Sequence, residues 1–208
     1  MLPHRNFIIV ISSPSGTGKS SIIDEIRKRD NGLSFSVSAT TRKPRASEVD
    51  GKNYYFLTEE EFSRKVGADE FLEHADVFGN QYGTLKNEIT RRFDESLDVI
   101  MDVDWQGNRQ ISSKMDRSEL LRIFLLPPTM KELERRIRKR NLDNDAVVNR
   151  RLGEARNEIV HFSEYDYVVV NNDFEKSVSD VSALITAKRI GNVLKDELNS
   201  FIRNLCDQ

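Results

Sequence analysis

A glycine-rich stretch near the start of the chain has the residue types and spacing of a phosphate-binding loop. It reads Ser13-Pro-Ser-Gly-Thr-Gly-Lys19-Ser20 and lies between an apolar run and a helical pattern. In such a loop the backbone N–H groups and the helix N-terminus face phosphate oxygens, the lysine reaches the outer phosphates, and the next hydroxyl ligates Mg²⁺. The chemistry indicated is phosphoryl transfer from a nucleoside triphosphate. Ser13 replaces the first glycine of the generic signature, so we expect some steric cost there.

Asp102 is the second candidate for this chemistry. It closes an apolar run, Val99-Ile-Met, and an acidic residue beside a phosphate loop could hold Mg²⁺ through water. The spacing is equally compatible with an ordinary carboxylate at the end of a strand. Both interpretations stay open at this point.

Two arginines point to the group that would receive the phosphoryl. Arg42 and Arg45 lie three residues apart, and Pro44 disfavours a helix there, which places them on a loop. The planar guanidinium fork suits a phosphate. Tyr54 and Tyr82 each stand beside turn residues, where a phenol could donate to phosphate or simply be half buried.

The elements that must position these residues alternate between strand and helix. The pattern predicts an α/β fold with parallel strands and crossover helices. Apolar, β-branched runs predict buried strands, and charged or periodic stretches between them predict helices. The strands are expected at 7–11, 97–103, 121–126 and 167–170, and the helices at 19–29, 129–140, 146–160 and about 175–205.

The segment 33–84 has a different pattern. It is richer in polar residues and turns, with a short strand-like piece at 54–57. Thr58 and Glu61 form the sequence signature of a capping box, which predicts the start of a helix. We expect this segment to be an inserted subdomain.

Composition limits the class of protein. The 208 residues suit one compact unit, and 32 basic against 34 acidic side chains give a net charge of -2. No global field therefore favours nucleic acid or a membrane surface, and neither is expected as a partner. Cys206 is the single cysteine, and the early apolar run is too short for a leader or a membrane helix. We expect a cytoplasmic protein.

Several segments together resemble the guanylate kinases. The segments are Ser-Ala-Thr-Thr-Arg-Lys-Pro-Arg ending at Arg45, Glu48-Val-Asp-Gly, Glu73-His-Ala and Gly79-Asn-Gln-Tyr-Gly-Thr, and the likeness extends from about Ile8 to Asp173. The resemblance implies a P-loop NTPase-type three-layer fold with a parallel core sheet, an inserted mixed α+β GMP-binding subdomain and a helical lid. The implied boundaries are 1–32, 85–128 and 162–208 for the core, 33–84 for the insertion and 129–161 for the lid.

The resemblance also assigns residues to the acceptor GMP. It implies that the GMP phosphate is held by Ser38, Arg42, Arg45, Tyr54 and Tyr82, and that the base is read by Glu73, Thr84 and Asp104. Chemistry supports Glu73 as the main guanine selector, because guanine offers two donors, N1–H and the exocyclic NH₂, that one carboxylate can accept together. Adenine offers a lone pair at N1 instead.

The donor ATP is assigned in the same way. The implied ATP-binding residues are Ser13, Pro14, Ser15, Gly16, Thr17, Gly18, Lys19, Ser20, Ser21, Arg136, Arg140 and Asn171, the last beside the adenine. The implied catalytic residues are Lys19, Arg42, Arg136, Arg140 and Arg151, with Mg²⁺ on Ser20 and, through water, Asp102. Without the resemblance, the charged run 131–140 would be interpreted as a solvated helix face. Asn141 stands where family members often have glycine, which leaves the lid hinge undefined.

The implied activity is transfer of the γ-phosphoryl of ATP to GMP, giving ADP and GDP, in purine nucleotide metabolism and GMP recycling. The acceptor is an ionised phosphate oxygen, so no strong general base is needed. Two alternatives remain: an inactive guanylate-kinase-like interaction module, and an enzyme of the same scaffold with another acceptor. The final helix could pack on its own core or on a partner subunit, so a homodimer or a higher homo-oligomer is left open.

Overall fold

The larger sheet carries the nucleotide-binding loop. The computed structural model describes residues 3–77, 79–140 and 145–206, and for Arg140 only the backbone. Within this part of the chain, five parallel strands lie in the order β2-β7-β1-β8-β9. Their bounds are Leu33–Phe35 for β2, Asp98–Asp102 for β7, Ile8–Ser12 for β1, Leu120–Leu126 for β8 and Tyr167–Val170 for β9.

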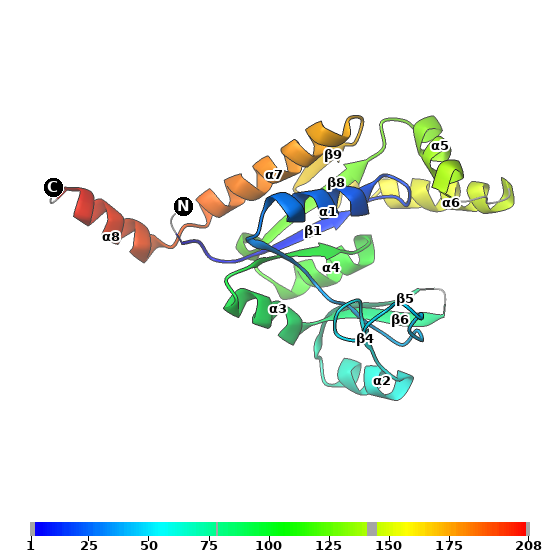
Figure 1. Cartoon of the computed structure of the whole chain (residues 1–208), viewed down its shortest axis with the longest axis horizontal. Coiled ribbons are helices and arrows are strands. Elements are labelled where there is room, and N and C mark those ends of the chain that lie inside the picture. Colours follow the sequence, from blue (N-terminus) through cyan, green and yellow to red (C-terminus); the bar gives the residue numbers. More distant parts are fainter. Residues whose placement is uncertain (1–2, 78, 141–144, 207–208) are drawn as a thin grey trace.

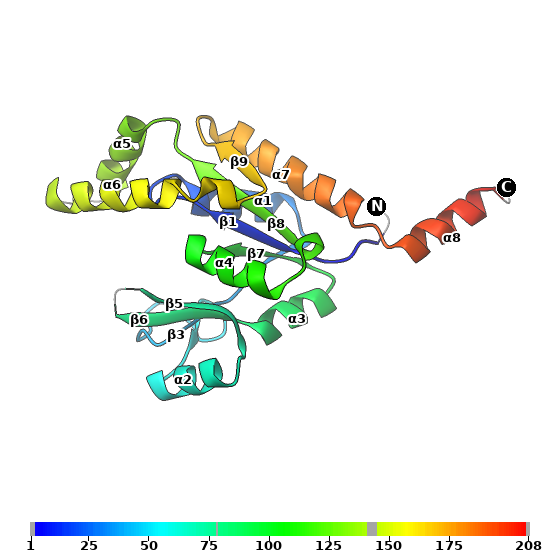
Figure 2. The same cartoon turned by 180° about the vertical axis from the view of Figure 1, so that it is seen from behind.

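Helices cover both faces of this sheet. Figures 1 and 2 show α1 (Lys19–Arg29) and α7 (Phe174–Gly191) on one face, and α3 (Lys86–Asp94) and α4 (Trp105–Lys114) on the other. Side chains alternate along a strand, so Ile9 of β1 packs with α1 and α7, whereas Ile8 packs with α3 and α4. The expected three-layer α/β fold is confirmed.

A smaller mixed sheet lies beside the larger one (Figure 1). Its strand order is β4-β3-β6-β5, with bounds Tyr55–Phe56 for β4, Ala39–Thr40 for β3, Asn80–Leu85 for β6 and Phe71–Val77 for β5. Helix α2 (Glu59–Gly67) packs Phe62 against Phe71 of this sheet, and the capping box between Thr58 and Glu61 is present as expected. The segment expected as an insertion, 33–84, begins with β2, which pairs with β7 in the larger sheet. The separate sheet starts at Ala39.

Two helices form an arm beyond the end of the larger sheet. They are α5 (Met130–Arg140) and α6 (Asp145–Ile159), and they bury Leu133 and Ile137 against Val148 and Leu152. The expected helices at 129–140 and 146–160 are thereby confirmed. Asn141, where the hinge position was undefined, lies outside the described residues.

Strand β9 differs from its expected buried state. Only Val169 is buried, while Tyr167, Val168 and Val170 are 47%, 42% and 52% exposed. The reason is its position at the edge of the sheet. Helix α7 packs against one face of β9, and among the described strands only β8 pairs with it. Composition alone does not distinguish an edge strand from a central one.

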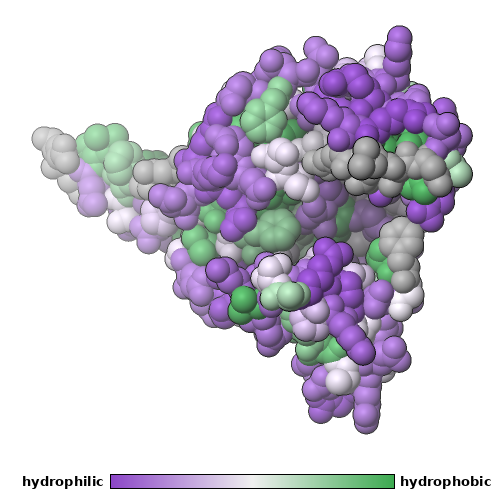
Figure 3. Space-filling model, turned by 45° about the vertical axis from the view of Figure 1, so that its right-hand side comes forward, coloured by the Kyte–Doolittle hydropathy of each residue, from purple (hydrophilic) through white to green (hydrophobic). Residues whose placement is uncertain are grey.

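The C-terminal segment forms two helices instead of the single one expected at about 175–205. Helix α7 ends at Gly191, and α8 (Lys195–Cys206) projects away from the body of the molecule (Figures 1 and 3). Four apolar side chains of α8 are exposed: Leu198, Phe201, Ile202 and Leu205. Short 3₁₀ turns at Arg117–Glu119 and Phe162–Glu164 complete the fold. In the described ranges, no helix has the length and apolar character needed to cross a bilayer.

Candidate active site

The phosphate loop has the backbone shape that its glycines allow. It connects β1 to α1, and Gly16 and Gly18 have φ of 92° and 104°, in the left-handed region. A Cβ at Gly18 would lie 2.8 Å from Nδ2 of Asn171, so a larger residue would also clash there. Ser13 does not adopt a positive φ. The prediction that serine has a steric cost at this position is therefore wrong. The loop leaves the strand in a conformation that serine can adopt.

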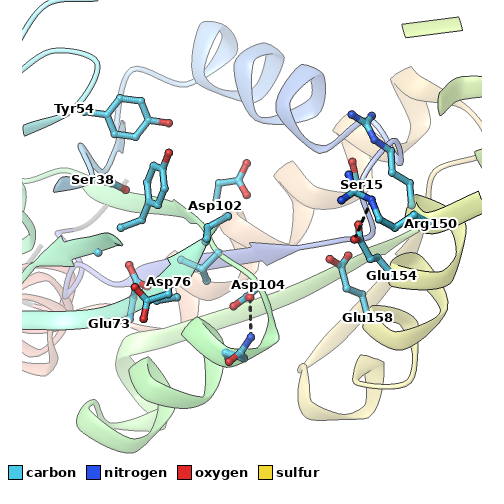
Figure 4. A pocket seen from close by; sticks show the side chains of 17 residues that line it. Ser15, Ser38, Tyr54, Glu73, Asp76, Asp102, Asp104, Arg150, Glu154 and Glu158 are labelled. Atoms are coloured by element: carbon cyan, nitrogen blue, oxygen red, sulfur yellow. Dashed lines mark hydrogen bonds and ion pairs between the residues drawn. The ribbon is translucent and has the colours of Figure 1, made fainter. Parts of the chain in front are cut away.

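Two adjoining cavities surround this loop. The larger, of about 920 Å³, lies between the smaller sheet, the ends of the core strands and the α5–α6 arm, and Figure 3 shows the hollow on this face. The smaller, of about 330 Å³, is lined by residues 13–20. Both cavities are lined by Ser15, Asp102, Asp104 and Glu158, so they meet at these residues. Figure 4 shows Ser38, Tyr54 and Glu73 on one side of the larger cavity, and Ser15 and Glu158 on the other.

Glu73 lies on the wall formed by the smaller sheet. It is buried and pairs across the strands with Thr84, whose hydroxyl donates a hydrogen bond of 2.7 Å to Oε1 of Glu73. Burial raises the pKa of Glu73 above its ordinary value; the Thr84 hydrogen bond opposes this shift, and the charge of Asp104 adds to it. The hydrogen bond from Thr84 thus fixes the orientation of the Glu73 carboxylate. Further hydrogen-bond donors would stabilise its charged form.

Asp104 reaches the same wall from the larger sheet. It caps the N-terminus of α4, accepting the backbone N–H of Gly107 at 2.9 Å. Gly107 allows this helix to approach Glu73, because a Cβ there would lie 2.9 Å from Cβ of Val103 and 3.3 Å from Oε2 of Glu73. Glu73, Thr84 and Asp104 therefore lie close together at one cavity wall. This is the arrangement expected from the sequence for residues that read the base.

Arg42 lies behind the cavity wall. Its guanidinium donates to both oxygens of Glu48, at 3.0 and 2.8 Å, and stacks 5.4 Å from the ring centre of Tyr54. The hydrogen bonds that Arg42 donates to Glu48 raise the pKa of Arg42 and lower the pKa of Glu48. Tyr54 and Tyr82 line the cavity and meet edge to face at 6.0 Å. Arg42 is thus connected to the cavity by its contact with the ring of Tyr54.

Arg45 and Ser38 have different surroundings. The side chain of Arg45 is exposed, and its backbone N–H donates to Glu48 at 2.7 Å. Arg45 does not line either of the two cavities described above, whereas Ser38 lines the larger one. Of the five residues expected around the acceptor phosphate, the structure brings Ser38, Tyr54 and Tyr82 to the cavity and Arg42 to its edge.

Lys19 begins α1, directly after the glycines of the phosphate loop. Its ammonium forms an ion pair with Asp102 at the end of β7, and both residues line the smaller cavity together with Ser20. The strand register explains this ion pair. Ile11 of β1 lies opposite Asp102 in the parallel ladder, and the chain passes from the end of β1 through the phosphate loop to Lys19. A cation, a carboxylate and a hydroxyl therefore meet at the carboxyl edge of the sheet, where parallel-sheet proteins bind ligands.

Arg136 of α5 is tied to the other side of the loop. Its Nη1 donates to the carbonyl of Thr17 at 3.0 Å, its Nη2 donates to the carbonyl of Asn171 at 3.1 Å, and its Nε contacts Glu132 at 2.8 Å. Hydrogen bonds from Arg135 and Arg136 lower the pKa of Glu132 to about 2. Glu132 was not expected from the sequence, although its position four residues before Arg136 is a readable helical pairing.

Asn171 has a structural contact with the loop. It is buried, and its Nδ2 donates to the carbonyl of Thr17 at 2.7 Å. Together with Gly16, Gly18, Ser21 and Arg136 it lines a third cavity, of about 500 Å³. This cavity shares no lining residue with the larger cavity, and it contacts the phosphate loop at Gly16 and Gly18. Of the other two expected arginines, Arg151 lines the larger cavity, and the side chain of Arg140 lies outside the described residues.

Comparison with known proteins assigns the family. A model of the guanylate kinase family matches residues 5–188. The chain belongs to the guanylate kinase family. A guanylate kinase from Paramagnetospirillum magneticum is 45% identical over 201 residues, covering 97% of this chain and 94% of that protein. One from Rickettsia prowazekii is 45% identical over 189 residues, covering 91% and 95%.

A solved structure supports the same assignment. A guanylate kinase from Anaplasma phagocytophilum superposes with a TM-score of 0.69 at 35% sequence identity, covering 90% of this chain and 88% of that one. The range matched by the family model, 5–188, includes both sheets and the α5–α6 arm. The guanylate kinase family thus accounts for the fold, and the resemblance noted in the sequence is confirmed.

Proposed function

We infer that the chain catalyses transfer of the γ-phosphoryl of ATP to GMP, giving ADP and GDP, in purine nucleotide metabolism and GMP recycling. The observation that carries this inference is a pair of adjoining cavities, with Glu73 on the wall of the larger one and the phosphate loop lining the smaller one. A nucleotide base and a phosphoryl donor can therefore face each other across one continuous cleft. Such alignment supplies much of the catalysis in phosphoryl transfer.

Glu73 is the proposed selector of guanine. Its carboxylate is buried and accepts a hydrogen bond from the hydroxyl of Thr84, and it can accept guanine N1–H and the exocyclic NH₂ as well. Asp104 lies close enough to influence the charge of Glu73 and is the proposed third contact to the base. An adenine would leave the carboxylate facing a lone pair, which costs binding energy.

The acceptor phosphate is proposed to bind near the tyrosine pair. Tyr54 and Tyr82 supply phenol donors and Ser38 a hydroxyl at the cavity surface. Arg42, held by Glu48 and stacked on Tyr54, supplies the positive charge, and Arg45 on the same loop is proposed to join it. The bidentate pair with Glu48 fixes the guanidinium before a ligand arrives, which lowers the entropy lost on binding.

ATP is proposed to bind along the loop, from Ser13 to Ser21, with its base toward the cavity beside Asn171. Lys19 and the arginines of the α5–α6 arm, Arg136, Arg140 and Arg151, would neutralise the charge that spreads over the transferred phosphoryl. We propose that residues 129–161 act as a lid that excludes water from this group. Residues 33–84 would form the acceptor subdomain, and 1–32, 85–128 and 162–208 the core.

A divalent cation fits the residues at the loop. Ser20 and Asp102 offer hard oxygen donors at the same cavity, and Mg²⁺ typically takes few protein ligands together with phosphates and water. When bound, Mg²⁺ would supply charge neutralisation at the donor phosphates. Lys19 then has two roles: it pairs with Asp102 and it contacts the outer phosphates.

The alternatives make different demands on the same residues. An inactive interaction module does not need a phosphate loop, yet Gly18, Lys19 and Ser20 are all intact. An enzyme for another acceptor does not need a buried carboxylate facing the substrate. Turnover should therefore be measured with GMP, AMP, UMP and CMP, on the wild type and on Glu73→Gln. We expect GMP to be the best acceptor by a wide margin, and Glu73→Gln to lose about a hundredfold or more in kcat/KM for GMP.

Two outcomes would contradict this function. If another nucleotide equals GMP as acceptor, the guanine assignment fails. If no acceptor yields ADP, the kinase assignment fails too. Glu70→Gln, an exposed carboxylate just before the same strand, is the matched control and should behave like the wild type.

The surroundings of the enzyme are a further part of the proposal. We propose that the chain acts in the cytoplasm on small molecules, and that it self-associates through α8, whose apolar side chains Leu198, Phe201, Ile202 and Leu205 are exposed. Sedimentation of the wild type and of a chain truncated after residue 194 measures this. If the wild type and the truncated chain have the same number of subunits per particle, α8 does not form the interface.

A further inference from the structure

Glu158 is an acidic residue at the junction of the two cavities that the proposed reaction does not use. It lies near the end of α6 and lines both cavities. Ser15 of the phosphate loop lines both cavities with it. Oxygen Oε2 of Glu158 is buried and has no hydrogen-bond partner among the described residues. Figure 4 shows the side chain beside Ser15 and across from Asp104.

This position brings a negative charge into a place suited to phosphate. The backbone N–H groups of such loops bind phosphate oxygens in nucleotide complexes. Here a carboxylate from another element, that of Glu158 on α6, lines the same cavity as the loop. The side chain of Glu158 thus places an anion in the cavity where oxygens of the donor would lie.

The charges around Glu158 come from four elements. Lys19 on the loop attracts it; Asp104 at the start of α4 and Glu154 on α6 repel it. Asp102 at the end of β7 lines the same cavity, and the ring of Tyr165 lies close enough to be affected by its charge. Burial is the main cause that raises the pKa of Glu158 to about 7. The carboxylate is therefore charged above neutral pH and largely neutral below it.

We propose that Glu158 is an anionic gate of the donor site: its carboxylate lies in the cavity of the phosphate loop, and ATP binds fully only when this carboxylate is displaced or neutralised. The repulsion links the phosphates of ATP to α6, because a phosphate in this cavity repels the side chain that α6 carries. The gate deepens the proposed function and rests on its donor half, the binding of ATP at the loop. Glu158 is a positioning residue and does not touch the transferred atoms.

Removal of the charge tests the gate. The affinity for ATP is measured by titration calorimetry, with excess Mg²⁺ and without GMP, at pH 8 and pH 6. We expect Glu158→Gln to bind ATP about fivefold more tightly than the wild type at pH 8, since one repelling charge near the phosphates is gone. At pH 6 the difference should shrink toward none, because the wild-type carboxyl is then mostly protonated. ADP carries less phosphate charge than ATP, so the gain in affinity of Glu158→Gln over the wild type should be smaller for ADP.

A matched variant separates the gate from a general charge effect. Glu154→Gln removes the same charge one turn earlier on α6, from a side chain that is 48% exposed. We expect it to bind ATP as the wild type does at both pH values. Glu158→Ala, which also removes the anion, is measured in parallel, so that the test does not depend on the folding of one variant.

The outcomes are distinct. Equal or weaker ATP binding by the folded Glu158 variants at pH 8, or an equal gain in Glu154→Gln, would overturn the gate. In either case the wild type still binds ATP, and the proposed function stands. Absence of ATP binding in the wild type would overturn the proposed function itself. A gain confined to Glu158 and to high pH supports the gate.

Discussion

The hydroxyl of Thr84 donates a hydrogen bond of 2.7 Å to Oε1 of Glu73, across two strands of the smaller sheet. This bond favours the ionised carboxylate, whereas burial and the charge of Asp104 favour the neutral acid. The charge state of Glu73 is therefore set by opposing contributions of which Thr84 is the main stabilising one. A base with two donors needs the ionised form.

Thr84→Val tests this balance. Loss of the hydrogen bond should raise the pKa of Glu73 further, so that more of the enzyme carries the neutral acid as the pH falls. The neutral acid cannot accept both guanine donors, and KM for GMP should therefore rise more steeply in the variant than in the wild type between pH 8 and pH 6. The pH profile of KM measures this, with Thr90→Val on α3 as control. Superimposable profiles for Thr84→Val and the wild type would refute the coupling.

Glu48→Ala should weaken the acceptor side alone. Without the bidentate pair, Arg42 loses its fixed orientation, and binding must then order its guanidinium. We expect KM for GMP to rise about tenfold, since a charge-assisted hydrogen bond contributes roughly 1.5–3 kcal/mol, while KM for ATP changes little. Steady-state kinetics with each substrate varied separates the two. A matching rise in KM for ATP would mean that the loop is disrupted more widely; Glu60→Ala, exposed on α2, is the control.

Lys19→Ala should nearly abolish turnover while GMP binding stays largely intact. The lysine is proposed to contact the donor phosphates, and its loss removes charge neutralisation at the transferred group, which we expect to cost about a thousandfold or more in kcat. Turnover by ADP release and GMP affinity by calorimetry are measured on the same preparation. Lys28→Ala, on the exposed side of α1, should retain activity. An equal loss of GMP affinity would contradict the assignment of Lys19.

Glu158→Gln should change the dependence of stability on pH. The pKa of Glu158 is raised to about 7, so the folded chain keeps a proton that the unfolded chain releases near pH 4.5. Unfolding then releases this proton between these values, and the unfolding free energy of the wild type falls as the pH rises through that window. Glutamine carries no charge and lacks this loss. We expect the variant to be more stable by about 1–2 kcal/mol at pH 8, after allowance for solvent screening, and equal at pH 4.5. Urea unfolding at the two pH values measures it; equal stability at pH 8 would contradict the shift.

Much of the fold could be predicted because its signals are local. The apolar run before the loop, the Gly16 and Gly18 pattern and the capping box at Thr58 all depend on neighbours a few residues away. The break between α7 and α8 was missed, since the segment 175–205 contains no proline and Gly191-Asn192 is its local signal of a helix end. The exposure of β9 was missed too, because it depends on which strand lies at the edge of the sheet.

The candidate site was predictable only in part, for a related reason. Glu73 and Arg42 were found through the motifs that surround them. Glu48 and Glu158 were missed, because each acts through a partner that chain geometry supplies. The partner of Glu48 is Arg42 across a turn, and Glu158 lies at the cavity of the phosphate loop, which belongs to another element. A carboxylate in a helical sequence carries no mark of such a contact.

The sequence by itself determined the phosphate loop, the alternation of strands and helices, and the family. These follow from residue type and short spacing, which act through backbone conformation and hydrophobic periodicity. Only the tertiary structure decided which polar groups meet: Lys19 with Asp102, Glu73 with Thr84 and Asp104, and Glu158 with the cavity of the phosphate loop. The physical reason is that an electrostatic interaction depends on distance in space and on burial, and both are set by strand register and packing across the whole chain.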